Sequence, residues 1–219
     1  MTTESALREE ICRVGRSLFD RGYVHGTAGN ISVCLPEGYL ITPTDACLGF
    51  LEADKLAKVA LDGSQLSGDR ASKTLALHRQ IYGADDTASC VIHSHSRNLV
   101  ALSLSPDCGT SDFLPPITPY YVMKVGHVPL IPYHRPGDPT VGEIVAQTIR
   151  TMRARGTPIR AVMIERLGPN VWHSSLTAAM ATLEELEETA YLWRTCDPKP
   201  MPLTADQIEE LRKRFGAAW

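Results

Sequence analysis

An apolar strand that ends in two histidines constrains this fold more than any other feature of the chain. The stretch reads Cys90-Val-Ile-His93-Ser-His95, and an apolar run after a polar turn is typical of a strand buried inside a sheet. Because side chains alternate along a strand, we expect His93 and His95 to lie on one face, about 7 Å apart. Two neutral imidazoles there would supply part of a metal site. The alternative is that they cap the strand and hydrogen-bond to nearby loops.

Helical and strand-like patterns alternate along the rest of the chain. Apolar residues at helical spacing predict several helices, and short apolar runs between turns predict strands. The expected helices cover 5–23, 51–58, 72–82, 97–104, 141–153 and 176–193, with a last helix opened by the capping box Thr204-x-x-Gln207. Besides the histidine strand, the expected strands cover 31–35, 39–41, 59–61, 128–132 and 159–164. This order indicates an α/β domain with a mixed sheet, and we expect residues 1–219 to form a single domain.

Composition excludes several classes of function. The 219 residues carry a net charge of −3 and contain no basic run, so we expect no nucleic-acid partner. No apolar stretch approaches the length of a membrane span, and the first residues lack the pattern of a signal peptide. The six cysteines form no Cys-x-x-Cys pair, which predicts reduced thiols in a cytoplasmic protein. They are Cys12, Cys34, Cys47, Cys90, Cys108 and Cys196.

Seven segments, taken in order, resemble the class II aldolase/adducin family. They are Gly26-Thr-Ala-Gly-Asn-Ile-Ser32, Ile41-Thr-Pro-Thr44, Ser67-Gly-Asp-Arg70, Leu77-His78, Val91-Ile-His-Ser-His95, Pro132-Tyr-His-Arg-Pro-Gly-Asp138 and Leu183-Glu-Glu-Leu-Glu-Glu-Thr189. The similarity covers nearly the whole chain and is greatest for the branch that decarboxylates 3-oxo-tetronate 4-phosphates. It implies a three-layer α/β/α sandwich with a mixed central sheet. It also implies a homo-oligomer, often a tetramer, with the active site near a subunit interface.

The resemblance further implies a metal-dependent lyase that acts on a small molecule. Family members hold a divalent metal, usually zinc, with a His-x-His pair and a third histidine from a later Asn-His-Gly loop. A glutamate on the helix before the pair handles protons or joins the metal, and small-residue loops bind substrate phosphate. The metal polarises an oxygen, so that a carbon–carbon bond beside a carbonyl can break. The positions that match this pattern are Gly29, Asn30, Thr44, Ser72, Lys73, His93 and His95.

Three positions of the same site depart from the pattern. Asp45 follows Thr44 where the sugar-phosphate aldolases have glycine, and unless Lys73 or Arg70 neutralises it, its charge disfavours a phosphate dianion. Thr74 replaces the glutamate and cannot act as a general base near neutral pH. Leu167 stands in place of the third histidine and cannot coordinate a metal. We therefore expect a substrate and a proton carrier that differ from those of the standard members.

A replacement metal ligand could come from Glu165, two residues before Leu167. On an extended segment the two would share a face, and His93, His95 and Glu165 would then form the two-histidine, one-carboxylate set that suits iron(II). The alternative is that Glu165 is a solvated or ion-paired residue at the end of a strand. His134 and His173 are further candidates, although each also reads as a surface histidine.

Four other residues near these motifs are candidates for the site. Tyr120 and Tyr121 stand near the position of a proton-donating tyrosine in the family, although ring packing at a subunit interface explains them equally well. Lys73 is a possible proton carrier or cation, with a solvated helix start as its alternative. His78 matches a helical position of the family and is expected to hydrogen-bond beneath the site.

Three functions fit these observations. The first is a lyase that breaks or forms a carbon–carbon bond, or removes carbon dioxide, beside a carbonyl of a small oxygenated substrate. The second is a repurposed biosynthetic enzyme of the same fold, either metal-free or a non-haem iron oxygenase. The third is a non-catalytic binding module. The residues favour the lyase, with Lys73, Thr74, Tyr120 and Tyr121 as catalytic candidates.

Overall fold

A mixed sheet of eight strands forms the centre of the computed structural model, which describes residues 3–105 and 112–219. Its strand order is β4-β3-β2-β1-β5-β8-β7-β6, and every neighbouring pair is antiparallel except β6 and β7. The histidine strand β5 lies between β1 and β8, inside the sheet. The strands are β1 Asn30–Leu35, β2 Gly38–Ile41, β3 Ala57–Ala60, β4 Gln65–Ser67, β5 Cys90–His93, β6 Leu130–Ile131, β7 Ala161–Ile164 and β8 Gly168–His173.

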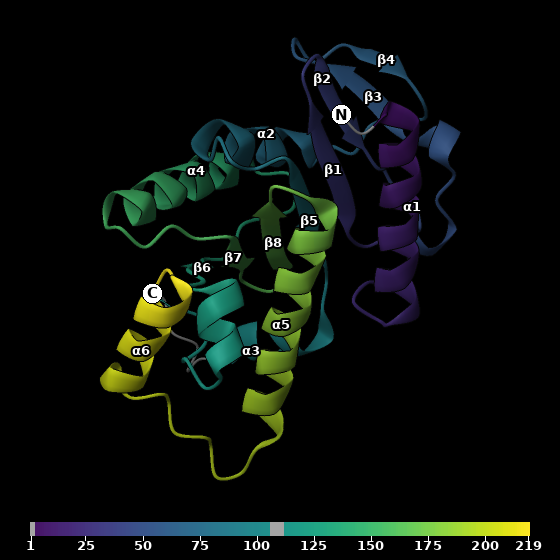
Figure 1. Cartoon of the computed structure of the whole chain (residues 1–219). Coiled ribbons are helices and arrows are strands. Elements are labelled where there is room, and N and C mark those ends of the chain that lie inside the picture. Colours follow the sequence, from purple (N-terminus) through teal and green to yellow (C-terminus); the bar gives the residue numbers. More distant parts are fainter. Residues whose placement is uncertain (1–2, 106–111) are drawn as a thin grey trace.

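Helices cover both faces of this sheet, as Figure 1 shows. Helices α1 (Glu4–Asp20), α3 (Arg97–Ser103) and α5 (Leu176–Thr195) pack on one face together with Ile92. Helices α2 (Leu75–Ala84) and α4 (Pro139–Ala154) pack on the other, together with Val91. Adjacent residues of β5 thus contribute to opposite cores, as the pleat of a strand requires. The predicted three-layer α/β/α sandwich is confirmed.

Two of the predicted element boundaries depend on caps. The capping box of Thr204 and Gln207 opens α6 (Ala205–Phe215) as predicted. Helix α1 begins at Glu4 because Thr3, rather than Ser5, accepts a hydrogen bond from the N–H of Ala6.

Among the residues that the structure describes, no helix is long and apolar enough to cross a membrane. Five of the six cysteines are free, and Cys108 lies outside the described residues.

The prediction of a helix over 51–58 is wrong. One short 3-10 turn, η2 (Ala53–Lys55), and the start of β3 occupy that segment, and another turn, η1 (Leu48–Phe50), precedes it. Sequence patterns also missed β4 and β8. The start of β8, Gly168-Pro169, reads as a turn, but Gly168 allows the backbone to pass close to β5: a Cβ there would lie 2.0 Å from the carbonyl oxygen of Ser94.

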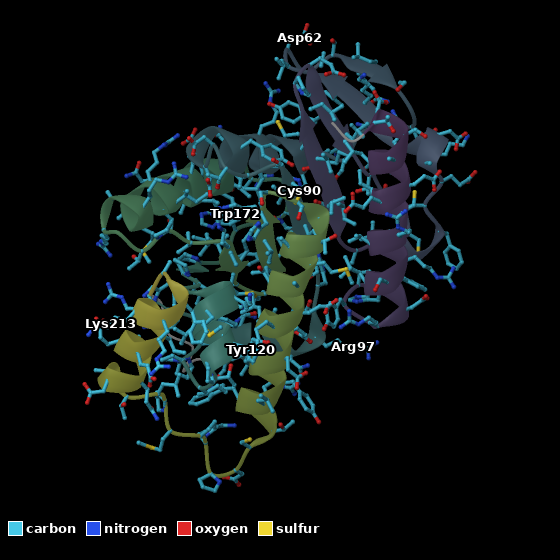
Figure 2. The ribbon with its side chains drawn as sticks, viewed as in Figure 1. Asp62, Cys90, Arg97, Tyr120, Trp172 and Lys213 are labelled. Carbon is cyan, nitrogen blue, oxygen red and sulfur yellow. The ribbon has the colours of Figure 1, made fainter. Side chains whose placement is uncertain are left out.

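A buried carboxylate joins the layers on the α2–α4 side. Asp85, at the end of α2, is 2% exposed and accepts hydrogen bonds from the indole Nε1 of Trp172 at 3.0 Å and from Arg153 and Arg160 at 2.6 and 3.0 Å. Burial by itself raises the pKa of Asp85, but its bonds to Thr87, Trp172 and Arg160 outweigh burial and lower it. Trp172 lies between the sheet and this helical layer (Figure 2).

We predict that Asp85→Ala lowers the free energy of unfolding by about 2–3 kcal/mol, because it leaves the buried indole N–H of Trp172 without an acceptor and removes the carboxylate that Arg153 and Arg160 share. Urea unfolding followed by circular dichroism measures the change. Asp86→Ala is the matched control: its carboxylate is 85% exposed and pairs with the same Arg153, so a loss below about 1 kcal/mol is expected. Equal losses in the two variants would contradict the role of Asp85.

Candidate active site

The two histidines meet where β5 ends. The strand stops at His93, so His95 lies in the following loop and not on the strand as predicted, although the two side chains do face one another. Their Nε2 atoms are 3.2 Å apart. The Nδ1 of His93 lies 2.9 Å from the carbonyl oxygen of Pro169, which can only accept, so Nδ1 carries the hydrogen and the Nε2 lone pair faces His95. Metal-binding histidines are commonly oriented by such a carbonyl.

Burial keeps this pair neutral. Desolvation lowers the pKa of His93 to about 3, and it also lowers the pKa of His95; a neighbouring imidazole contributes in each case. The exposed ring of His25 lies edge-on to that of His95, with 6.2 Å between centroids. The sequence did not indicate His25 as a neighbour of the pair. His25 precedes a loop of small residues, and the path of such a loop cannot be predicted from local patterns.

Three predicted substrate or catalytic residues form one hydrogen-bonded group next to His93. Asn30 pairs directly with His93 in the register of β1 and β5, and its Nδ2 donates to Thr74 Oγ1 at 3.3 Å. The hydroxyl of Ser72 lies 3.2 Å from the same Oγ1. Gly29 is required just before Asn30: it has φ +85°, and a Cβ there would lie 2.7 Å from Val24. The group offers amide and hydroxyl contacts to an oxygen-rich ligand.

The corner at Thr44 and Asp45 borders this group. The N–H of Thr44 donates to the carbonyl of Arg70 at 2.8 Å, and the N–H of Ser72 donates to the carbonyl of Thr42 at 3.3 Å. These bonds hold the corner beside the segment that leads into α2. Lys73 is exposed at the same place, and within the described ranges it forms no ion pair.

Asn170 is a buried polar residue that sequence patterns missed. It lies on β8 directly opposite His93, is fully buried, and neither polar atom of its side chain has a partner among the described residues. His78 of α2 is buried against the sheet, with Nδ1 2.7 Å from Ser32 Oγ and with Nε2 also unpartnered in the described chain. An asparagine inside an apolar strand would have indicated a functional position. The strand β8 was not predicted from the sequence, so this signal could not be used.

Several predicted residues are directed elsewhere. The carboxylate of Glu165 accepts from the N–H of Tyr133 at 3.0 Å and from Arg166 Nε at 3.2 Å, which matches the ion-paired alternative. Tyr121 is fully buried, and its hydroxyl donates to the carbonyl of Leu114. Tyr120 is 61% exposed on the outside of the molecule (Figure 2), so of the two tyrosines it alone is accessible to a ligand or a second subunit. His134 is partly exposed, with Nδ1 2.7 Å from the carbonyl oxygen of Pro132.

The residues present provide only part of a metal centre. His93 and His95 direct neutral nitrogens at one point, as metal ligands must. Leu167 packs against the apolar cluster under α2 and α4 instead of supplying a third donor. Within residues 3–105 and 112–219, no three His, Cys, Asp or Glu side chains are grouped to hold a metal ion. The iron oxygenase interpretation therefore lacks its third ligand among the described residues.

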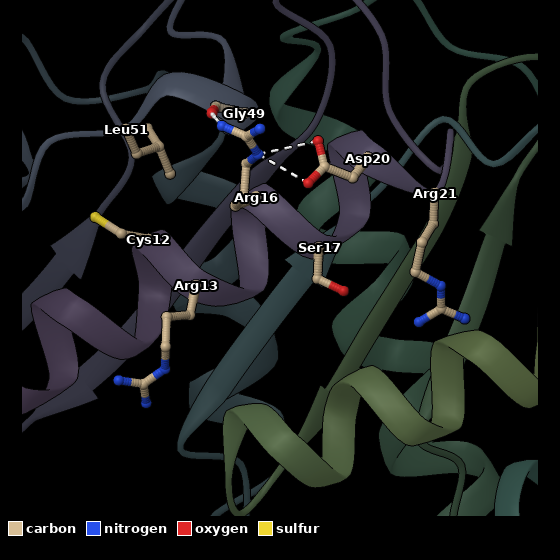
Figure 3. Close-up of a pocket in the computed structure, with 8 residues that line it drawn as sticks. All are labelled: Cys12, Arg13, Arg16, Ser17, Asp20, Arg21, Gly49 and Leu51. Carbon is tan, nitrogen blue, oxygen red and sulfur yellow. Dashed lines mark hydrogen bonds and ion pairs between the residues drawn. The ribbon is translucent and has the colours of Figure 1, made fainter.

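A hollow beside α1 is separate from this site. Its volume is about 570 Å³, and Arg13, Arg16 and Arg21 lie along it (Figure 3). Arg16 bonds to Asp20 at 2.8 Å, and Arg21 pairs with Glu184. The hollow contains no histidine and none of the residues predicted for the site. We assign no function to it.

The geometry fits a known family. The model of the class II aldolase and adducin N-terminal domain matches residues 9–193, and the chain belongs to this family. A 3-oxo-tetronate 4-phosphate decarboxylase of Cupriavidus necator is 56% identical to it over the full length of both chains. One of Escherichia coli is 43% identical, with 95% of this chain and 96% of the relative covered.

Solved structures give the same result. The crystal structure of YgbL from Klebsiella pneumoniae superposes with a TM-score of 0.86 at 43% identity and covers 97% of this chain and 100% of its own. The L-fuculose-1-phosphate aldolase of Thermus thermophilus has a TM-score of 0.72 at 26% identity, over 84% and 91% of the two chains. The predicted family and its decarboxylase branch are confirmed, and so is the prediction of a carbon–carbon lyase. A divalent metal is the usual cofactor of this family.

We predict that Leu167→His raises the affinity for zinc by at least tenfold, because it adds a third imidazole at the position where the resemblance expects one. Competition with a chromophoric chelator measures the dissociation constant. Leu167→Asn, which introduces a polar side chain of similar size without an imidazole, should leave the affinity unchanged. The idea fails if Leu167→His folds normally and binds zinc no more tightly than the parent chain.

Proposed function

We propose that this chain removes carbon dioxide from a small, hydroxylated 3-oxo acid. The observation that carries the proposal is the group formed by Asn30, Ser72 and Thr74 beside the His93–His95 pair. Amide and hydroxyl contacts suit an oxygen-rich substrate, and an imidazole N–H suits an oxygen that becomes negative. The relatives named as 3-oxo-tetronate 4-phosphate decarboxylases support the same reaction class.

The reaction needs stabilisation of an enolate and one proton. When the bond between the carboxylate and its neighbouring carbon breaks, the electron pair moves toward the ketone oxygen and carbon dioxide leaves. The carbon then takes up one proton. The Nε2–H of His95, which in the free site points at His93, can donate to that oxygen. Asn30 and Ser72 would hold the substrate hydroxyls, and Lys73 is the cation closest in sequence to them.

Thr74 serves in binding rather than proton transfer in this scheme. Its hydroxyl already accepts hydrogen bonds from Asn30 and Ser72. A threonine hydroxyl is also too weak a base to take up a proton near neutral pH. We propose zinc, before iron(II), as the metal that the imidazole pair would bind, since neutral imidazole suits both and zinc is the usual family metal. The N–H contact of His95 described above belongs to the metal-free site, because an Nε2 atom that binds a metal carries no hydrogen.

We also propose that residues 1–219 form one domain that assembles as a cytoplasmic homotetramer. The exposed Tyr120 is then available to a site on a neighbouring subunit. Light scattering on the purified chain gives the mass of the assembly, and a monomer at micromolar concentration would contradict this part of the proposal.

We predict that His95→Asn lowers kcat for decarboxylation by at least 100-fold, because the variant lacks the imidazole N–H beside the developing negative charge. The measurement is carbon dioxide release from 3-oxo-tetronate 4-phosphate and from the same acid without its phosphate. His134→Asn, at a partly exposed histidine outside the site, is the control and should retain full activity. Failure of the parent chain to release carbon dioxide from either acid above the buffer rate would refute the proposed function.

A further inference from the structure

The glutamate-rich part of α5, residues 183–189, contacts both segments of the chain that flank His95. Two of its glutamates, Glu184 and Glu187, are about one helical turn apart and lie on one face of the helix. Glu187 is buried, with only 6% of its surface exposed. A carboxylate stays charged in a buried layer only when it is paired or hydrogen-bonded, so the partners of Glu187 indicate what it does.

Glu187 caps the helix that follows His95. The first N–H groups of a helix have no partner within the helix, and the side chain of the N-cap residue of α3, Ser96, forms no capping hydrogen bond. The carboxylate of Glu187 accepts from the backbone N–H groups of Asn98 and Leu99 at 3.0 and 3.2 Å, and from Nδ2 of Asn98 at 2.9 Å. The start of α3 is therefore held by α5 instead of by its own N-cap.

Glu184 is connected to the other neighbour of His95 through Arg21. The backbone N–H of His95 donates to the carbonyl oxygen of Tyr23 at 3.2 Å. Arg21 lies over the ring of Tyr23, 4.9 Å from its centroid, and donates to the hydroxyl of that ring at 3.2 Å. The same guanidinium forms an ion pair with Glu184. The segment whose carbonyl holds His95 is thus fixed to α5 as well.

The loop that carries His95 is short. Only residues 94–96 connect the end of β5 with the start of α3. Because so short a loop has few possible paths once its ends are fixed, the place of the His95 ring depends on where α3 begins and on the Tyr23 carbonyl. That ring directs Nε2 to within 3.2 Å of Nε2 of His93. A shift of about 1 Å in a reacting group can lower a rate by up to about 100-fold.

We infer that Glu184 and Glu187 are positioning residues that hold the His95 imidazole in the site without touching the substrate. This inference rests on the proposed decarboxylation and goes beyond it by naming the groups on which the placement of His95 depends. Glu187 contributes more, because it is buried and accepts three hydrogen bonds. The ion pair of Arg21 and Glu184 is partly exposed, so solvent weakens it.

The first test measures carbon dioxide release from 3-oxo-tetronate 4-phosphate. Glu187→Gln keeps the size of the side chain but turns an NH2 group toward N–H groups that need an acceptor, and kcat should fall about tenfold. KM should stay nearly unchanged, because the contacts of Asn30 and Ser72 remain. Glu184→Gln should lower kcat about threefold. Glu188→Gln, at the exposed neighbour on the same helix, is the matched control and should retain full activity.

A double variant shows whether Glu187 acts through His95. His95→Asn combined with Glu187→Gln should have the kcat of His95→Asn alone, because the placement of the imidazole no longer matters once the imidazole is absent. Losses that multiply in the double variant would overturn the inference. So would a Glu187→Gln variant that has a lower Tm but keeps the kcat of the parent chain well below that temperature, because Glu187 would then only stabilise the fold.

Nuclear magnetic resonance of the imidazole C–H groups separates this inference from the proposed function, since it requires no turnover. The His95 signals, assigned with His95→Asn, should shift in Glu187→Gln and stay in place in Glu188→Gln. Shifted signals in a chain that releases no carbon dioxide refute the decarboxylation and retain the positioning role. Unshifted signals in a folded Glu187→Gln refute that role at any level of activity. If Glu187→Gln does not fold, the partly exposed Glu184→Gln decides by the same signals.

Discussion

The pairing of β5 with β1 on one side and β8 on the other is the constraint on which the site depends. It places Asn30, His93 and Asn170 in register across three neighbouring strands. It also brings the carbonyl of Pro169 within 2.9 Å of His93 Nδ1, which sets the tautomer of that ring. Gly168 makes this approach possible, since any side chain there would collide with Ser94. The chemistry of the imidazole pair thus follows from backbone register.

Burial determines the charge state of this region. His78 and His93 are enclosed, and desolvation lowers the pKa of each to about 3. Both are therefore neutral over the whole physiological range. Asn30 and Asn170 likewise present carboxamides without charge. The charged side chains of Lys73 and Asp45, on neighbouring segments, are exposed, so the buried part of the candidate site is neutral and the charges lie on the surface.

The sequence predicted the fold well where patterns were long. The helices α1, α4 and α5 carry several turns of apolar spacing, and the hairpin of β1 and β2 has a clear turn. The strands that the sequence patterns did not predict are short. Strand β4 is exposed at all three residues, and β8 begins with Gly-Pro, so neither has the alternation that identifies a strand. The helix expected over 51–58 is absent because one 3-10 turn, η2, and the first residues of β3 occupy that segment.

The candidate site was predicted less completely, for a physical reason. Motif residues such as Asn30, Ser72 and His93 could be placed together because they follow or precede recognisable elements. His25 and Asn170 could not, since their proximity to the pair arises from loop path and strand register that no local pattern contains. Glu165 is the opposite case, a residue that the sequence suggested for the site. It lies two residues before Leu167, yet its carboxylate bonds to Tyr133 and Arg166.

The two ends of the sheet limit how the molecule can associate. At one edge β6 has only two residues, between Pro129 and Pro132, and proline cannot donate to another strand. At the other edge β4 has three residues. Edges this short offer little template for adding a strand from a second chain. Contacts between copies of the chain are therefore expected on the helical surfaces and loops. Aggregation by addition of strands to the sheet edges is disfavoured, even in a concentrated solution.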